Sequence, residues 1–99
     1  KITIAKEDIE SNISNALKLY ELDNEFFPTT SQGLTALLVR PSTPPTPSNW
    51  SGPYLEKKPI DPWNNPYQYK NPGEHGTGYD LYSYGPDPTN DASWINNWS

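Results

Sequence analysis

Proline is the residue that most limits what this chain can fold into. Eight of the twelve prolines in its 99 residues fall between positions 41 and 66. Because proline has no backbone N–H and a fixed φ, this stretch can form neither a regular helix nor a central strand. A connection of this length inside a small domain is usually functional or well packed. Regular structure is therefore expected before residue 41 and after residue 66, with other contacts holding the connection.

The N-terminal part, residues 4–22, is predicted to form an amphipathic helix. Apolar residues recur there every three or four positions, and polar residues fill the opposite face. The apolar stripe consists of Ile9, Ile13, Ala16 or Leu17, and Tyr20. The pattern is already helical at the first residues and no N-cap motif precedes it. We therefore expect the helix to begin upstream in the whole protein.

A second, shorter helix is predicted before the proline-rich connection. Thr30 or Ser31 can act as its N-cap, and Leu34 and Leu37 have helical spacing. Pro41 is expected to end it, because the residue before a proline is disfavoured in the α conformation.

The C-terminal third is predicted to contain an antiparallel hairpin. Residues 67–70 and 79–84 alternate in polarity, and the segment 71–76 between them carries the glycine and proline of a turn. Trp94, Ile95 and Trp98 can dock the tail back onto the domain. One α+β domain spanning residues 1–99 is the expected architecture.

Composition excludes several classes of protein. There are no cysteines, so disulfides and thiolate metal sites are ruled out. A net charge of −5 without a large basic cluster argues against nucleic acid or an anionic membrane surface as a partner. A mean hydropathy of −0.89 combined with 13% aromatic residues indicates a core that depends on large rings.

These rings also leave an alternative function open. They could line a groove for a sugar or a proline-rich peptide, as in a secreted binding module, although packing of the core is the simpler interpretation. The set consists of Trp50, Tyr54, Trp63, Tyr67, Tyr69, Tyr82 and Tyr84.

The loop after the hairpin carries the candidate site. Asp87 and Asp91 lie four residues apart, and no Lys or Arg follows Lys70. Calcium takes six to eight oxygen ligands, and two such carboxylates could share one ion. Ligands that could complete the shell are Thr89, Asn90, Ser93 and the carbonyl of Tyr84. The alternative is a solvated acidic loop held by Asx-turns.

The sequence offers little evidence for a catalytic site. His75 is the only histidine, lies in a glycine-rich turn and has no expected nucleophile beside it. A two-carboxylate glycosidase could draw on Glu74, Asp80, Asp87 and Asp91, but nothing singles out a pair.

Five motifs resemble one known family, the major pseudopilins of type II secretion systems, and their order and spacing match from about residue 6 to residue 98. The motifs are Tyr20-Glu-Leu-Asp-Asn, Pro28-Thr-Thr-Ser-Gln-Gly-Leu-Thr-Ala-Leu, Pro59-Ile-Asp-Pro-Trp-Asn-Asn-Pro-Tyr, Asn71-Pro-Gly-Glu-His-Gly and Tyr79-Asp-Leu-Tyr-Ser-Tyr-Gly-Pro-Asp. The hydrophobic N-terminal helix of that family, with its processing site, does not occur in this sequence.

The resemblance implies a pilin-like fold and a structural role without enzymatic activity. It implies the periplasmic domain of a protein anchored in the bacterial inner membrane through that N-terminal helix. Copies would assemble with each other and with other pseudopilins into a periplasmic pseudopilus, in contact with the inner-membrane secretion platform.

The resemblance also implies a calcium ion, Ca2+, in the C-terminal loop. Asp87 matches a side-chain ligand, Asp91 lies in the second ligating stretch, and the Tyr84 carbonyl matches a backbone ligand. This sequence lacks a second carboxylate after Asp91, where many members have one, so Thr89 and Ser93 become candidate ligands instead.

Overall fold

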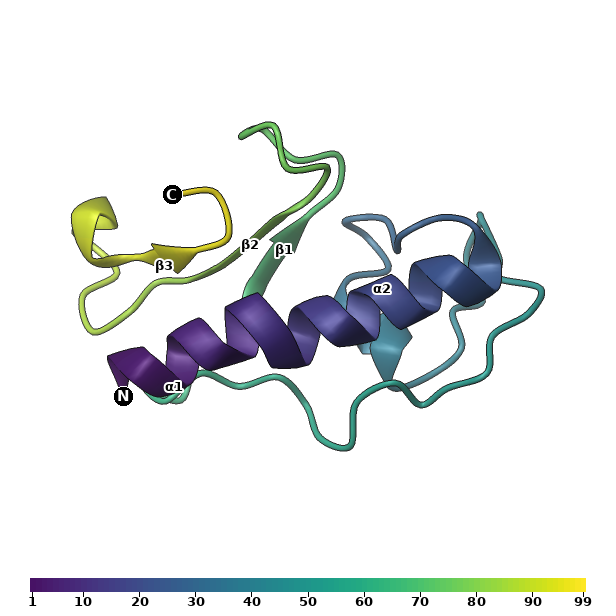
Figure 1. Cartoon of the computed structure of the whole chain (residues 1–99), viewed down its shortest axis with the longest axis horizontal. Coiled ribbons are helices and arrows are strands. Elements are labelled where there is room, and N and C mark those ends of the chain that lie inside the picture. The colour runs from purple at the N-terminus through teal and green to yellow at the C-terminus, as the bar shows by residue number, and fades with distance from the viewer.

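The computed structural model describes every residue from Lys1 to Ser99, and a helical rod runs along one side of the molecule (Figure 1). The rod consists of α1 (Ile2–Glu7), a π-helical segment η1 (Asp8–Asn12) and α2 (Ile13–Asn24), without a break between them. The predicted N-terminal helix is thus confirmed and extends slightly at both ends. None of the helices combines the length and the apolar character needed to cross a membrane.

The buried face of the rod is the stripe expected from the sequence. Ile9, Leu17 and Tyr20 have no exposed surface, and Ile13 and Ala16 are 2% exposed. Full burial of a side chain of this size contributes about 1.5–3 kcal/mol, so this stripe anchors the helix to the rest of the domain.

A wider π turn interrupts the α-helix at η1, which the sequence pattern did not predict. The Asp8 carboxylate accepts hydrogen bonds from Asn12 Nδ2 (2.8 Å) and from the hydroxyl of Tyr67 (2.7 Å). Burial, and then the hydrogen bond to Asp8, raise the pKa of Tyr67 above its ordinary value, so its hydroxyl remains a donor. The wide turn therefore lies where the helix is tied to the residue that precedes β1.

The second helix predicted between Thr30 and Val39 is only a single 3-10 turn, η2 (Leu34–Leu37). Neither predicted N-cap residue caps it, because Gly33 occupies that position with a φ of 63°. Thr30 instead bonds with the backbone of Asn71, accepting from its N–H and donating to its carbonyl. A positive φ immediately before Leu34 prevents an α-helix from starting earlier.

The proline-rich connection is held by ring side chains, as the sequence suggested. The indole N–H of Trp50 donates to the carbonyl of Ala36 at 2.8 Å, and the Tyr54 hydroxyl donates to Asp23 at 2.7 Å. The backbone N–H of Tyr54 also donates to the Leu37 carbonyl. These bonds link the connection to α2 and η2 without a β-ladder.

The sheet has three antiparallel strands in the order β1 (Gln68–Lys70), β2 (Asp80–Ser83) and β3 (Ile95–Asn96). The predicted hairpin is confirmed as β1 and β2, with Tyr69 opposite Leu81. β3 was expected only as a docked tail, because a strand of two residues has no detectable alternation. It pairs with β2 and packs near α1 (Figure 1).

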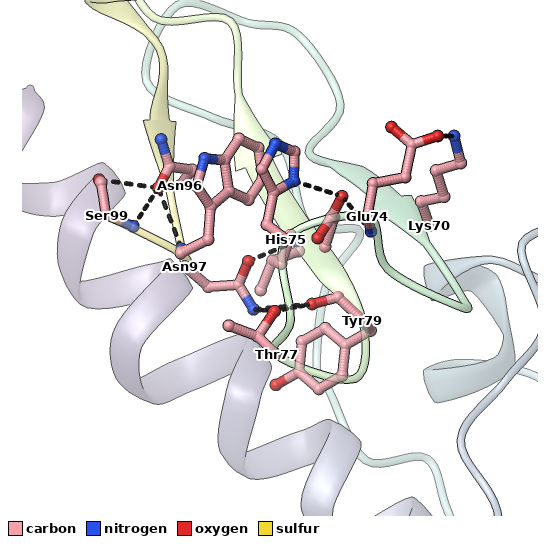
Figure 2. Close-up of polar contacts among 11 residues, drawn as sticks. Lys70, Glu74, His75, Thr77, Tyr79, Asn96, Asn97 and Ser99 are labelled. Atoms are coloured by element: carbon pink, nitrogen blue, oxygen red, sulfur yellow. Dashed lines mark hydrogen bonds and ion pairs between the residues drawn. The ribbon is translucent and has the colours of Figure 1, made fainter.

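The C-terminal tail is held by side-chain hydrogen bonds of Asn96 and Asn97. Those of Asn97 continue the pairing with β2, and those of Asn96 bind the backbone that follows. Asn97 Oδ1 accepts from the Leu81 N–H at 2.9 Å, and its Nδ2 donates to the Tyr79 carbonyl at 3.0 Å (Figure 2). Asn96 Oδ1 accepts from the N–H groups of Trp98 and Ser99 at 3.0 and 2.8 Å. The chain therefore turns away from β2 after residue 97.

Candidate functional site

The acidic loop joins the end of β2 to the start of β3, and its two ends touch. Gly85 has a φ of 67°, and a Cβ at this position would lie 2.5 Å from the carbonyl oxygen of Ser93. Only glycine permits both the left-handed backbone and this close approach. Next to this contact, the rings of Tyr84 and Trp94 pack edge to face with centroids 4.9 Å apart. The loop thus has a fixed base and an exposed tip.

Asp87 and Thr89 lie together at the exposed tip. One oxygen of Asp87, Oδ1, accepts from the Thr89 N–H at 3.0 Å and from the Thr89 hydroxyl at 2.6 Å. The hydroxyl and then the N–H lower the pKa of Asp87 below its ordinary value, so the carboxylate is charged at neutral pH. Its second oxygen, Oδ2, accepts no hydrogen bond from the chain and is available to a ligand.

Neutral oxygens gather around Ser93. Its hydroxyl lies 3.1 Å from the carbonyl oxygen of Asp87 and 2.8 Å from that of Asn90. Asn90 also caps the 3-10 turn η3 (Asp91–Ser93), with its side chain accepting from the Ala92 N–H. Two carbonyls and one hydroxyl therefore converge on one side of the loop, on the same backbone that carries Asp87.

The other two predicted ligands, Asp91 and Tyr84, make no hydrogen bond to Asp87, Thr89 or Ser93. The Asp91 carboxylate is exposed and makes no hydrogen bond, and it lines a hollow together with Glu74 and His75. Tyr84 precedes the Gly85–Ser93 contact, so its backbone lies near the loop base. The structure thus brings Asp87, Thr89 and Ser93 together, whereas Asp91, on the same loop, lines the hollow with Glu74 and His75.

This donor set is suited to a hard cation. No three carboxylate or histidine side chains gather at one point in the structure, so a metal here would rely on backbone and hydroxyl oxygens as well. Calcium accepts such mixed oxygen shells, whereas magnesium prefers to retain its waters. Asp87, Ser93, the Asn90 carbonyl and Asp91 are the residues that would hold it.

A polar network that the sequence did not predict lies at the opposite end of β2. His75 is an exposed turn residue, as expected, and in addition its Nδ1 lies 2.8 Å from Oδ2 of the buried Asp80 (Figure 2). Asp80 also accepts from the Glu74 N–H at 3.0 Å. Burial alone would raise the pKa of Asp80, but these two bonds more than offset it and the pKa is lowered. The spacing of five residues across a glycine-rich turn is the signal that could have revealed this pair.

The rings proposed for a sugar or peptide groove are mostly used in internal contacts. Tyr67 is buried and bonds to Asp8, the Tyr69 hydroxyl donates to the Pro28 carbonyl at 2.7 Å, and Tyr54 packs against Tyr20. Of the proposed set, only Tyr82 and Tyr84 lie on the outer face of the sheet with the C-terminal tryptophans.

The comparisons with known proteins converge on one family. The family model described as "Type II secretion system (T2SS), protein G" matches residues 1–98. The chain belongs to this family. It is 50% identical over 104 residues to the type II secretion system core protein G of Pseudomonas aeruginosa, covering 99% of this chain and 71% of that protein.

Other members of the protein G family match a smaller part of this chain. Core protein G of Escherichia coli is 50% identical over 76 residues, covering 76% of this chain and 52% of that protein. The corresponding protein of Vibrio cholerae is 45% identical over 75 residues, covering 76% and 51%. The chain thus matches between about half and about 70% of the length of these relatives.

A solved structure confirms the fold. The crystal structure of the major pseudopilin from the type 2 secretion system of enterohaemorrhagic E. coli superimposes with a TM-score of 0.81 at 35% identity. It covers 97% of this chain and 88% of that one. The pilin-like α+β fold expected from the motifs is therefore established, and the chain is a structural component of the major-pseudopilin type in type II secretion.

Proposed function

We propose that this domain is the periplasmic part of a filament subunit whose C-terminal loop is stabilised by calcium. The subunit assembles with further copies and with other pseudopilins, it is held at the inner membrane by a helix upstream of residue 1, and it contacts the secretion platform there. Its role is structural rather than enzymatic. Membership of the protein G family carries this proposal.

The oxygen set of the acidic loop supports calcium as the ion. Oδ2 of Asp87 and the whole carboxylate of Asp91 have no hydrogen-bond donors in the chain, so both are free to bind a cation. The Gly85–Ser93 contact fixes the base of the loop, so an ion would need to order only its tip. When bound, calcium would supply charge neutralisation and crosslink the tip. The side chains of Asp87 and Ser93 would hold it close to η3.

Melting the purified domain with and without calcium tests this proposal. At a hundredfold excess over the dissociation constant, a ligand that binds only the folded state stabilises it by about 2.7 kcal/mol. For a domain of this size, each kcal/mol shifts the melting temperature by roughly 4–8 °C. We therefore expect a chelator to lower the melting temperature by about 10 °C or more.

Two variants make the melting experiment specific. Asp87→Ala is expected to remove the response to calcium, whereas Glu56→Ala, an exposed acid in the proline-rich connection, should leave it unchanged. If the wild-type domain melts at the same temperature in chelator and in calcium, the calcium proposal is wrong. That result would leave the family assignment and the filament role intact.

A further inference from the structure

A second acidic and aromatic feature lies on the outer face of the sheet. It is a hollow of about 300 Å3 beside the hairpin turn, and Figure 2 shows part of its wall. Its lining includes Glu74, His75, Asp80, Trp94 and Trp98. The hollow is separate from the tip of the acidic loop, although Asp91 reaches its edge.

Aromatic rings form one wall of this hollow. His75 stacks on Trp98 with ring centroids 3.8 Å apart and planes 6° apart. Tyr82 stacks on Trp94 at 5.4 Å and meets Trp98 edge to face at 5.5 Å. Tyr82, Trp94 and Trp98 are only partly buried, so part of this row of rings is open to solvent. Such faces attract cations and pack against proline rings.

Carboxylates outnumber cations around the hollow. Glu74 and Asp80 line it, in addition to Asp91, which the calcium proposal assigns to the ion, and Lys70 is the only lysine or arginine there. Lys70 pairs with Glu74, but their side chains are 45% and 64% exposed. Exposed pairs of this kind contribute little, about 0–1 kcal/mol. Another cation could therefore replace Lys70 at small cost.

Two buried polar atoms at the hollow have no partner. They are Oδ1 of Asp80, which accepts no hydrogen bond, and Nε1 of Trp94, which donates none. Native proteins satisfy most buried polar atoms, and each exception needs an explanation. Oδ1 of Asp80 lies against Gly73, where an added Cβ would come within 2.7 Å of it, and both atoms are closed to solvent, so these two atoms do not themselves define a ligand in the hollow.

The same chain presents a segment with matching chemistry. Arg40 is the only arginine, is exposed, and has no carboxylate within 4.0 Å. Residues 41–47 follow it with four prolines. Gln32 Nε2 donates to the carbonyls of Thr43 (2.7 Å) and Pro45 (3.1 Å), which fixes the segment, while the side chains of residues 42–46 stay exposed. The segment is thus presented in one shape before any partner binds.

We propose that the hollow binds the Arg40–Pro45 segment of a second copy of this chain. The guanidinium would lie against the His75–Trp98 stack and pair with Glu74, and the prolines would pack on the Trp94 side. Arginine suits this position better than lysine, because its planar group both stacks on rings and forms paired hydrogen bonds with carboxylates. The proposal rests on the filament role and adds to it one specific contact between subunits.

The positions of the two features make the contact head-to-tail. Residues 25–50 gather where α2 ends, whereas β3 and the C-terminus lie toward α1 (Figure 1). Because donor and acceptor surfaces differ, each copy that binds one neighbour leaves its own segment free for the next. Such heterologous contacts extend into open helical arrays when the rotation between neighbours does not close into a ring.

Disulfide crosslinking in the full-length subunit tests the contact directly, because this chain contains no cysteine. The double variant Arg40→Cys with Glu74→Cys is expected to give a ladder of linked subunits in secreting cells. The matched control is Lys18→Cys with Glu74→Cys, which places the first cysteine on an exposed basic position of α2. Each single variant should give no ladder. Equal crosslinking by the control pair, or none by the test pair, would overturn the proposal.

Charge reversal provides a second, independent measurement. Arg40→Glu should lower filament yield at least tenfold, and adding Glu74→Arg should restore most of it. The calcium response of the melting temperature should persist in all these variants, so failure here is distinguishable from failure of the calcium proposal.

A peptide experiment separates the two possible occupants of the hollow. A synthetic peptide of residues 40–48 should shift the indole N–H NMR signals of Trp94 and Trp98, and the peptide with Arg40→Glu should shift them at least tenfold less at equal concentration. If the peptide binds but copies never crosslink, the occupant is a segment of another protein, and the proposal of a second copy is wrong.

Discussion

Asp61 and Asp87 begin with the same local chemistry and end in opposite surroundings. Each lies beside proline, and in each the Oδ1 atom accepts the N–H of the residue two positions later, Trp63 or Thr89, at 3.0 Å. Asp61 is only 3% exposed and its Oδ2 accepts from the buried Ser83 hydroxyl at 2.7 Å. The Oδ2 of Asp87 has no such donor.

The difference comes from tertiary contact rather than from the turn itself. β2 passes next to Asp61 and supplies Ser83, whose oxygen also accepts the Gly85 N–H at 3.0 Å. Asp61 therefore joins the proline-rich connection to the sheet, with every oxygen satisfied by the protein. Asp87 projects beyond the sheet, where only solvent or an ion can reach it. A shared Asx-turn thus stabilises the fold in one place and offers ligands in the other.

Among the substitutions that test this comparison, Asp61→Ala should have the largest effect on stability. The substitution removes the acceptor of three hydrogen bonds and leaves Ser83 and two N–H groups without partners. A buried donor left without an acceptor costs about 1–3 kcal/mol, and three donors are affected here, so a loss of about 3 kcal/mol or more is expected. We expect the free energy of unfolding, measured by urea denaturation, to fall by that order. A change below 1 kcal/mol would show that Asp61 is not the link described.

Substitution of Gly85 should have the next largest effect. In Gly85→Ala the left-handed backbone costs about 1–2 kcal/mol, and the new Cβ meets the Ser93 carbonyl oxygen at 2.5 Å. We expect a loss of about 2–3 kcal/mol in unfolding free energy, together with weaker calcium binding measured by calorimetry. Gly78→Ala is the matched control, because Gly78 has a φ of 89° but nothing within 4 Å of the new Cβ. Equal losses in both variants would show that the close approach to Ser93 does not matter.

A fall in pH should reveal the contribution of Asp80, which is buried at the start of β2. Its pKa in the folded state lies below the ordinary value, so the folded state binds its proton later than the unfolded state as the pH falls. Its contribution to stability is therefore complete above about pH 5 and is lost as the pH falls through the folded-state pKa. Urea denaturation between pH 6 and 2 should show a drop in unfolding free energy that is smaller in Asp80→Asn than in the wild type by roughly 1.5 kcal/mol, the lower end of the range for a hydrogen bond to a charged group. An identical pH profile in the variant would exclude this role.

The smallest effect should come from Asp87→Ala in the absence of calcium. Surface substitutions away from buried features usually change stability by no more than about 0.5 kcal/mol, and Asp87 is exposed. Denaturation in chelator should therefore hardly distinguish this variant from the wild type, in contrast to Asp61→Ala. A loss of 2 kcal/mol or more under these conditions would mean that the loop is stabilised by Asp87 itself rather than by an ion.

The elements predicted well from the sequence are those determined by local patterns. The stripe from Ile9 to Tyr20 and the alternation around Leu81 depend on periodicity, and the structure confirms both. The predicted short helix is present only as the 3-10 turn Leu34–Leu37, and its predicted N-cap is wrong, because Gly33 adopts a positive φ that a spacing of leucines does not reveal. The π turn at Asp8 was not predicted either, and the Asp8 carboxylate bonds there to Tyr67, which lies 59 positions away in the chain.

The candidate site was predicted only in part, because some of its contacts are local in sequence and others are not. Asp87 and Thr89 are neighbours in sequence, and they are neighbours in the structure. The contact of Gly85 with Ser93 and the partnership of His75 with Asp80 and Trp98 arise only when the strands pair. Whether Asp91 shares an ion with Asp87 stays a prediction.

The side-chain hydrogen bonds of Asn96 and Asn97 affect how the sheet edge behaves when many subunits are packed close together. A sheet edge with free N–H and carbonyl groups is a template on which neighbouring molecules can add strands. Here β3 has two residues, and Asn96 bends the following backbone away from the edge. Neighbouring subunits would find no continuous row of backbone groups to extend at this edge. This edge of the sheet, unlike that of β1, is thus protected against the addition of further strands.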